Sequence, residues 1–142
     1  MVDAVLFDLG NTLVHYWQRD EFPSILQEAI GAVKEELVRQ GLLAVPAPEM
    51  WQSVRDEDHE SQDHRVRPLE GRLARIFGLE GAPPDVVAAL CARFLAPMLG
   101  RGSCYPDAIP VLQSLKERMI QTAIVSNTPW GSPAGPWRAA ID

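Results

Sequence analysis

The feature that most constrains the fold is a short apolar run that ends in a carboxylate. The run from Val5 to Phe7 is long enough for a buried strand and too short for a helix that stands alone. Asp8 follows directly, and Gly10-Asn11 then interrupts regular structure. Open parallel sheets bind ligands at the carboxyl ends of their strands, so Asp8 is a candidate functional residue by position. The spacing leaves one alternative open, in which Asp8 is an Asx-turn residue that caps the next segment.

Four segments with helical periodicity follow, and no strand pattern separates them. They cover residues 20–41, 49–64, 68–77 and 84–99. Asp20 is the predicted cap of the first helix, with Pro23 in its first turn and Gly41 at its end. Pro97 is expected to fray or kink the last helix. The pattern therefore predicts an all-helical unit inserted after the first strand.

The second of these segments carries a cluster of acidic and histidine side chains. Its members are Asp56, Glu57, Asp58, His59, Glu60, Asp63 and His64. A metal site is one interpretation, but His59 and His64 are five residues apart and do not share a helix face as a four-residue zinc spacing requires. A solvated charged face is the favoured interpretation. Arg65 and Arg67 either balance this charge or reach toward an anionic substrate.

A second strand that ends in polar groups lies near the end of the chain. It is predicted over residues 122–127, after a helix that begins at Asp107 and has an apolar stripe of Val111, Leu112, Leu115 and Met119. The chain thus returns to the sheet by a crossover that we expect to be right-handed. Ser126 is either a ligand contact or a strand-end hydroxyl that satisfies a turn. Residues 129–136 are predicted to be a loop, and residues 137–142 the beginning of a helix.

Two stretches of the chain resemble motifs of the haloacid dehalogenase-like (HAD) hydrolase superfamily. Phe7-Asp8-Leu9-Gly10-Asn11-Thr12-Leu13-Val14 is similar to the first motif. The Tyr105-Pro106 turn, the helix end Leu115-Lys116-Glu117-Arg118 and the strand end Ser126-Asn127 are similar to the second motif and its approach. The resemblance implies an α/β fold, an incomplete Rossmann-like core with an inserted all-helical cap. Residues 1–16 and 101–142 are then the partial core, and residues 17–100 are the cap.

The resemblance also implies roles for the residues at the two strand ends. Asp8 is the nucleophile, which attacks phosphorus, or carbon in dehalogenases, and forms a covalent intermediate that water opens. Ser126 stabilises the charge that develops on the transferring group. Gly10, Asn11 and Asn127 are the substrate-binding residues. Mg²⁺ is held by the Asp8 carboxylate and the Gly10 carbonyl, since hard oxygen ligands suit this cation.

Gly10 leaves the reaction type open between three hypotheses. Phosphatases of the family usually carry a second Asp, the general acid and base, at this position. The leading hypothesis is a Mg²⁺-dependent phosphatase that acts on a small phosphate ester through an aspartyl-phosphate intermediate. A haloacid dehalogenase is the alternative within the class, although those enzymes typically have Tyr-Gly in place of Gly10-Asn11. A non-catalytic binding or regulatory protein on the same fold is the alternative from another class.

Two later motifs of the family have no counterpart in the sequence. The third motif supplies a Lys, whereas the only lysines are Lys34 in the predicted cap and Lys116 before the second strand. The fourth supplies paired acids, whereas Asp142 is the sole acid after Ser126. We therefore expect a truncated chain, or a folded half, with little or no turnover alone. Two parallel strands are marginal as a sheet, so we also expect self-association through the exposed sheet edge.

Composition excludes several other classes of protein. A net charge of -6 and a pI near 5.0 argue against nucleic-acid binding, which requires a basic face. No apolar stretch approaches the about 20 residues of a membrane-spanning helix, and no basic region precedes the first apolar run. Cys91 and Cys104 lack metal-ligand spacing and are expected to be free and buried. The predicted location is the cytoplasm, and the predicted partner is a small phosphorylated substrate.

Overall fold

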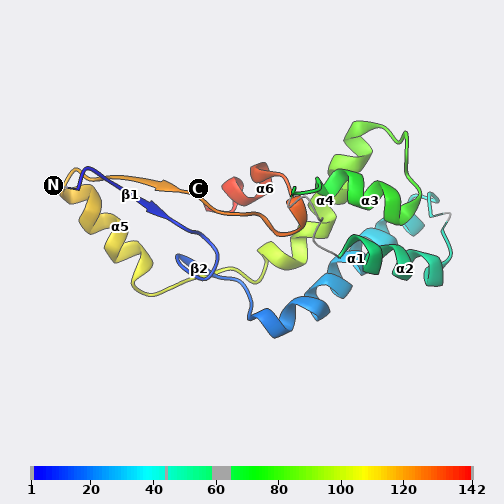
Figure 1. Cartoon of the computed structure of the whole chain (residues 1–142), viewed down its shortest axis with the longest axis horizontal. Helices are drawn as coiled ribbons and strands as arrows, with labels where there is room; N and C mark the ends of the chain where they lie inside the picture. Colours follow the sequence, from blue (N-terminus) through cyan, green and yellow to red (C-terminus); the bar gives the residue numbers. More distant parts are fainter. Residues whose placement is uncertain (1, 44, 59–64, 142) are drawn as a thin grey trace.

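The computed structural model describes residues 2–43, 45–58 and 65–141 of the chain. The molecule is elongated, with four helices gathered at one end and a two-stranded parallel sheet with one helix at the other (Figure 1). The C-terminal segment returns from the sheet to the helices. This combination of helices with a small parallel sheet confirms the predicted α/β class.

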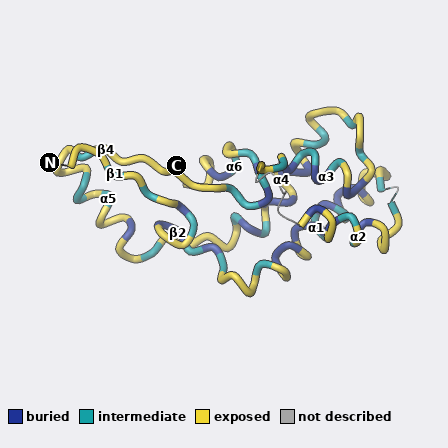
Figure 2. The backbone as a smooth tube through the Cα atoms, in the orientation of Figure 1, coloured by how far each residue is buried: buried dark blue, intermediate teal, exposed yellow. Residues whose placement is uncertain are grey.

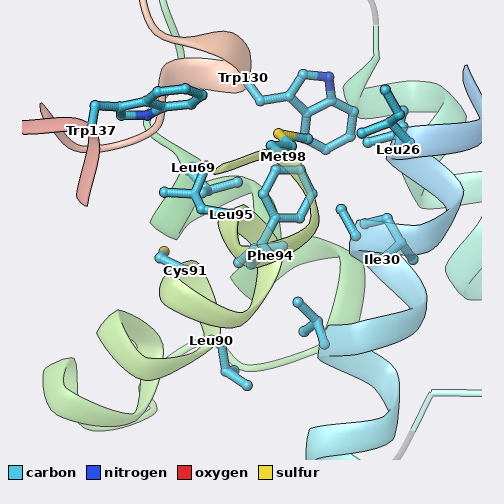
Figure 3. Close-up of a cluster of buried hydrophobic side chains, with 14 of the residues drawn as sticks. Leu26, Ile30, Leu69, Leu90, Cys91, Phe94, Leu95, Met98, Trp130 and Trp137 are labelled. Carbon is cyan, nitrogen blue, oxygen red and sulfur yellow. The ribbon is translucent and has the colours of Figure 1, made fainter. Parts of the chain in front are cut away.

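The four helices at one end form what we call the helical unit. They are α1 (Phe22–Arg39), α2 (Ala47–Glu57), α3 (Leu69–Phe77) and α4 (Pro84–Leu99). Helix α1 packs along α4, and α3 packs against both α2 and α4. Their apolar faces form a core (Figure 3) that includes the fully buried side chains of Ile30, Leu37, Leu69, Leu73, Ile76, Phe77, Leu90, Phe94, Leu95 and Met98. Because each such side chain contributes about 1.5–3 kcal/mol when buried, apolar burial is the main stabilising term of this unit.

Most of these helices begin or end near the residues that the sequence predicts. Gly41 has a φ of 69° two residues after the end of α1, and Gly78 adopts the left-handed conformation directly after α3. The predicted Asp20 cap is wrong, because Asp20 lies inside a 3₁₀ turn, η1 (Arg19–Glu21), and α1 begins after it with Glu21 as its N-cap. The Gln18 amide donates a hydrogen bond of 2.6 Å to the Glu21 carboxylate within that turn. Helix α4 continues through Pro97 to Leu99. A proline in the last turn removes one hydrogen bond of the helix and leaves the earlier ones intact, so the helix can continue past it for two residues.

Glu57 departs from the predicted solvated acidic face. Its carboxylate is buried and forms ion pairs with Arg75 at 2.5 Å and with Arg67 at 3.1 Å. The neighbouring acids Asp56 and Asp58 are exposed, as predicted. Burial of one carboxylate is possible here because two guanidinium groups from the next segment and from α3 compensate its charge. Arg67 thus balances acidic charge, whereas residues 59–64, with both predicted histidines, lie outside the described residues.

The two predicted strands pair with each other. Strand β1 (Ala4–Phe7) is parallel to β4 (Gln121–Ile124), with Ala4 opposite Gln121 and Phe7 opposite Ile124. Beyond the strands, the Val125 amide donates a hydrogen bond of 2.8 Å to the Phe7 carbonyl. The carboxyl ends of both strands are therefore side by side.

A second, very short sheet was not predicted from the sequence. Strand β2 (Val14–His15) is antiparallel to β3 (Ser103–Cys104). It joins the two points at which the chain leaves for the helical unit and returns from it. The approach there is close, because a Cβ on Gly102 would lie 2.8 Å from Cε1 of Tyr16. Strands of two residues are too short for alternation of apolar and polar side chains to reveal them.

The sheet end of the molecule has little cover. All four residues of β4 are exposed, and Leu6 in β1 is 67% exposed (Figure 2). Helix α5 (Ala108–Glu117) fully buries only Ala108. Of the predicted stripe, Leu112 is half-buried against the core and Leu115 is half-buried, whereas Val111 and Met119 are exposed. Met119 is 90% exposed. Apolar surface at the sheet is thus uncovered, as predicted from the pairing of only two strands.

The C-terminal segment is more regular than the predicted loop. It contains a 3₁₀ turn, η2 (Pro129–Gly131), and a short helix, α6 (Ala134–Ala139). Trp130 and Trp137 from these elements are buried and belong to the same hydrophobic core as the helical unit. No helix among the described residues is long and apolar enough to cross a membrane.

Candidate functional site at the strand ends

The parallel pairing brings four of the predicted site residues together. Asp8 and Gly10 follow β1, Ser126 and Asn127 follow β4, and these residues line one open cavity of about 480 Å³ with Val125. The register continues from the Phe7–Ile124 pair, so Asp8 lies opposite Val125. A carboxylate, a hydroxyl and an amide thus converge at the carboxyl edge of the sheet, the usual ligand position in parallel sheets.

The reactive side chains at this edge have few constraints. Asp8 and Ser126 are both exposed. The Ser126 hydroxyl donates a long hydrogen bond of 3.4 Å to the Asn127 carbonyl. A bond of that length is weak, so the hydroxyl can turn toward a ligand at little cost. Their placement therefore comes from the backbone and not from side-chain packing.

The turn after Asp8 is organised around one carbonyl and one left-handed residue. The Leu9 carbonyl accepts hydrogen bonds from the amides of Thr12, Leu13 and Val14, at 3.0–3.3 Å. Asn11 has a φ of 57°, a conformation that Asn tolerates better than most residues. This turn reverses the chain immediately after the strand and leads it into β2.

Asn11 is engaged within this turn. Its backbone N–H donates a hydrogen bond to the Val14 carbonyl at 2.7 Å, and its side-chain Nδ2 donates to the Trp17 carbonyl at 3.3 Å. Its Oδ1 lies 3.2 Å from Nδ1 of His15. A substrate contact by Asn11 stays a prediction, and such a contact would compete with these three interactions.

A larger cavity of about 970 Å³ adjoins the strand ends. It shares Gly10, Ser126 and Asn127 with the smaller cavity, and aromatic side chains of Tyr16, Trp17 and Trp137 line another part of it. Burial, and to a lesser extent Cys104, raises the pKa of Tyr16, so the phenol is neutral across the physiological range. The position of Trp137 beside the site was not predicted, because residues 137–142 were expected only to begin a helix. A Trp within a Pro- and Gly-rich segment was the signal that this tail is anchored.

The oxygen atoms at the strand ends fit a magnesium ion in part. The Asp8 carboxylate and the Gly10 carbonyl are hard oxygen donors on one cavity. Mg²⁺ is often held by one or two carboxylates, with water and substrate phosphate completing its shell. Among the described residues, no group of three His, Cys, Asp or Glu side chains forms a denser metal site. Asp8 and Gly10 would therefore hold such an ion only together with water and substrate.

Neither lysine lies at the strand ends. Lys116 is on α5 and borders a separate depression of about 510 Å³ with Met119 and Gln121. Lys34 belongs to α1 in the helical unit. Of the two thiols, Cys91 is free and buried as predicted, and burial raises its pKa to about 12. Cys104 is free but exposed, because the short strand β3 has no cover.

Comparison with known proteins identifies the family. The family model of haloacid dehalogenase-like hydrolases matches residues 2–141, and the chain belongs to that family. Comparison with curated proteins finds no match. A crystal structure described as a haloacid dehalogenase-like hydrolase from Bacteroides fragilis is similar with a TM-score of 0.41 and 16% identity. The similarity covers 99% of this chain and 57% of that one, so the chain spans little more than half of that protein's length.

Proposed function

We propose that the chain carries the nucleophile of a Mg²⁺-dependent phosphatase that acts on a small phosphate ester. The observation that carries this proposal is the placement of Asp8 and Ser126 after adjacent parallel strands on one cavity. Membership in the hydrolase family supports the reaction class. The division into a core of residues 1–16 and 101–142 and a cap of residues 17–100 belongs to the same proposal. The short β2–β3 sheet at 14–15 and 103–104 supports that division.

The proposed reaction has two steps. An oxygen of the Asp8 carboxylate attacks phosphorus, a P–O bond forms, and the bond to the leaving alcohol breaks. Water then attacks the aspartyl phosphate, which releases phosphate and restores the carboxylate. Ser126 donates a hydrogen bond to a phosphoryl oxygen, where it stabilises charge in the transition state. Mg²⁺, when bound at Asp8 and Gly10, would neutralise phosphoryl charge.

Gly10 leads to an expectation about the leaving group. Phosphatases of the family usually have an Asp at this position, which can protonate the leaving oxygen. Gly10 has no acidic side chain, so the leaving oxygen must take its proton from water. Aryl phosphates, whose leaving groups need no proton, should then be better substrates than alkyl phosphates. The dehalogenase alternative draws on the same absence of a second acid, and release of halide from a 2-haloacid would favour it. A chain that neither turns over these substrates nor forms a covalent adduct on Asp8 would favour the binding protein.

The test uses the 142-residue chain with a nitrophenyl phosphate and Mg²⁺. We expect at most a trace of phosphate release, together with a phosphoryl adduct on the peptide that contains Asp8, detected by mass spectrometry after acid quenching. Asp8→Asn should abolish both signals. The matched control is Asp3→Asn, because Asp3 is exposed at the opposite end of the same strand. Absence of the adduct in the unaltered chain, or its persistence in Asp8→Asn, would contradict the proposal.

A further inference from the structure

The segment that follows Ser126 runs directly onto the helical unit. Ser126 and Asn127 are exposed, and the Thr128 hydroxyl then donates a hydrogen bond of 2.7 Å to the Ser132 carbonyl. Between these two residues the chain makes a tight turn, in which Trp130 has a φ of 56° and Gly131 a φ of 67°. Two exposed residues are thus all that separates the sheet bond of Val125 from this turn.

The side chain of Trp130 is held by three helices. Its ring stacks on Phe94 of α4, with centroids 5.5 Å apart and planes at 27°. The Arg72 guanidinium of α3 lies 5.0 Å from the ring centroid, within cation–π range. The indole Nε1 donates a hydrogen bond of 3.1 Å to Asp58 after α2. Figure 3 shows Trp130 over Phe94 and Met98. We call Trp130 with Asp58, Arg72 and Phe94 the Trp130 latch.

The backbone of the turn also fits the helical unit closely. A Cβ on Gly131 would fall inside contact distance of the Arg67 carbonyl and lie 2.8 Å from Cγ1 of Val66. Glycine is therefore required at position 131 both for its positive φ and for this approach. A second contact supports the turn, because Nε1 of Trp137 donates to the Ser132 hydroxyl at 2.9 Å and its ring meets Tyr16 edge-on at 5.3 Å.

We propose that Trp130 is a positioning residue for Ser126 and Asn127. The sheet holds these two residues on one side through Val125, and the Trp130 latch holds them on the other. A short segment fixed at both ends loses conformational freedom before a ligand arrives, so less entropy is lost on binding. The latch also connects the helical unit to the end of β4. A movement of the unit relative to Asp8 therefore displaces or breaks the latch. The expected effect of the latch on substrate binding rests on the proposed function, whereas its effect on the order of residues 126–127 does not.

The first experiment removes one hydrogen bond of the latch from either side. Trp130→Phe keeps a ring for Phe94 and Arg72 but removes the donor, and Asp58→Ala removes the acceptor. We expect both variants to lower the backbone order parameters of Ser126 and Asn127 from the rigid range, about 0.85, toward the flexible range, below about 0.6. We also expect about two- to tenfold weaker binding of inorganic phosphate. Because both changes remove the same bond, the double variant should be no worse than either single one.

The controls are chosen from the same elements. Asp56→Ala removes an exposed acid of α2 that bonds only to Gln52 of its own helix, among the contacts that the structure describes, and should change neither readout. Gly131→Ala should loosen the segment, whereas Gly135→Ala, whose Cβ meets nothing within 4 Å, should not. Unchanged order parameters in Trp130→Phe, Asp58→Ala and Gly131→Ala would overturn the inference. Changed order parameters in a chain that never binds phosphate would keep the latch and contradict the proposed function.

Discussion

The backbone amide of Val125 donates a hydrogen bond of 2.8 Å to the carbonyl of Phe7. Each partner is followed directly by a residue of the candidate site, Phe7 by Asp8 and Val125 by Ser126. The separation of the carboxylate from the hydroxyl is therefore set by strand pairing and not by contacts between the two side chains. Substitution of either side chain should alter chemistry while the strand pairing persists, which makes variants at Asp8 and Ser126 informative about mechanism.

Glu36 should make the stability of the helical unit depend on pH. Its carboxylate accepts hydrogen bonds from Arg39, from Gln40 at 2.5 Å and from Arg93 of α4 at 3.3 Å. The bond from Arg39, followed by that from Gln40, lowers the pKa of Glu36 from 4.5 to about 2. Because the pKa is lower in the folded state, the ionised carboxylate stabilises the fold above about pH 4.5. This contribution is lost as the pH falls toward 2.

Urea unfolding of Glu36→Gln across this pH range checks the prediction. The variant should be less stable than the unaltered chain at neutral pH and should lose less stability on acidification. The control is Glu35→Gln, which changes the exposed neighbour of Glu36 in the same helix. Parallel pH profiles for the unaltered chain and Glu36→Gln would show that the pairing with Arg39, Gln40 and Arg93 contributes no pH dependence.

Loss of the Glu57 carboxylate should destabilise the contact between α2 and α3. Glu57→Gln removes the carboxylate that forms ion pairs with the guanidinium groups of Arg75 and Arg67. Because both cations retain partial access to water, we expect a loss of about 1–3 kcal/mol in the free energy of unfolding, less than for a fully buried pair. Equilibrium urea unfolding at neutral pH measures it. Glu49→Gln, an exposed change in the same helix, should fall within about 0.5 kcal/mol of the unaltered chain.

Two glycine substitutions should have opposite signs. Gly78 ends α3 with a φ of 64°, and a Cβ there would lie 3.1 Å from Cγ2 of Val45, so Gly78→Ala should cost about 1–2 kcal/mol. Gly31 lies inside α1, where a Cβ meets nothing within 4 Å. Gly31→Ala should therefore stabilise the chain by about 0.5–1 kcal/mol. Thermal unfolding measures both, and a shift of the same sign in the two variants would contradict this assignment.

The helical unit could be predicted from the sequence because its signals are local. Apolar side chains recur at helical spacing, and Gly41 and Gly78 mark helix ends where a left-handed residue is needed. The Asp20 cap failed because residues 19–21 form a 3₁₀ turn, so that α1 begins only at Phe22. The predicted loop of residues 129–136 failed for a different reason, because it contains η2 and the first half of α6. Its Pro and Gly content is typical of a loop, but its conformation depends on contacts of Trp130 with Phe94, far away in sequence.

The candidate site also has one part that the sequence predicts and one part that it does not. The convergence of Asp8 with Ser126 was predictable, because adjacent parallel strands bring their carboxyl ends together whatever the intervening chain does. The surroundings of these residues were not. The bonds of Asn11 to His15 and Trp17 arise from a turn whose left-handed residue is Asn. The aromatic wall formed with Trp137 requires the tail to return to the helical unit, and a Trp in a Pro- and Gly-rich segment indicates an anchor without indicating where it binds.

Uncovered apolar surface at the sheet end should cause the chain to self-associate. Leu6 is 67% exposed in β1, and Met119 is 90% exposed with a φ of 58°, where Asn is better tolerated than Met. The double variant Leu6→Thr and Met119→Asn should reduce association in sedimentation velocity without loss of stability, since neither side chain packs in the core. Val38→Thr is the matched control, because Val38 is 57% exposed on the helical unit. A chain that stays monomeric at all concentrations would contradict self-association. A Val38→Thr control that dissociates the chain equally would place the association surface elsewhere, because the open edges of β1 and β4 lie at the sheet end and not on the helical unit.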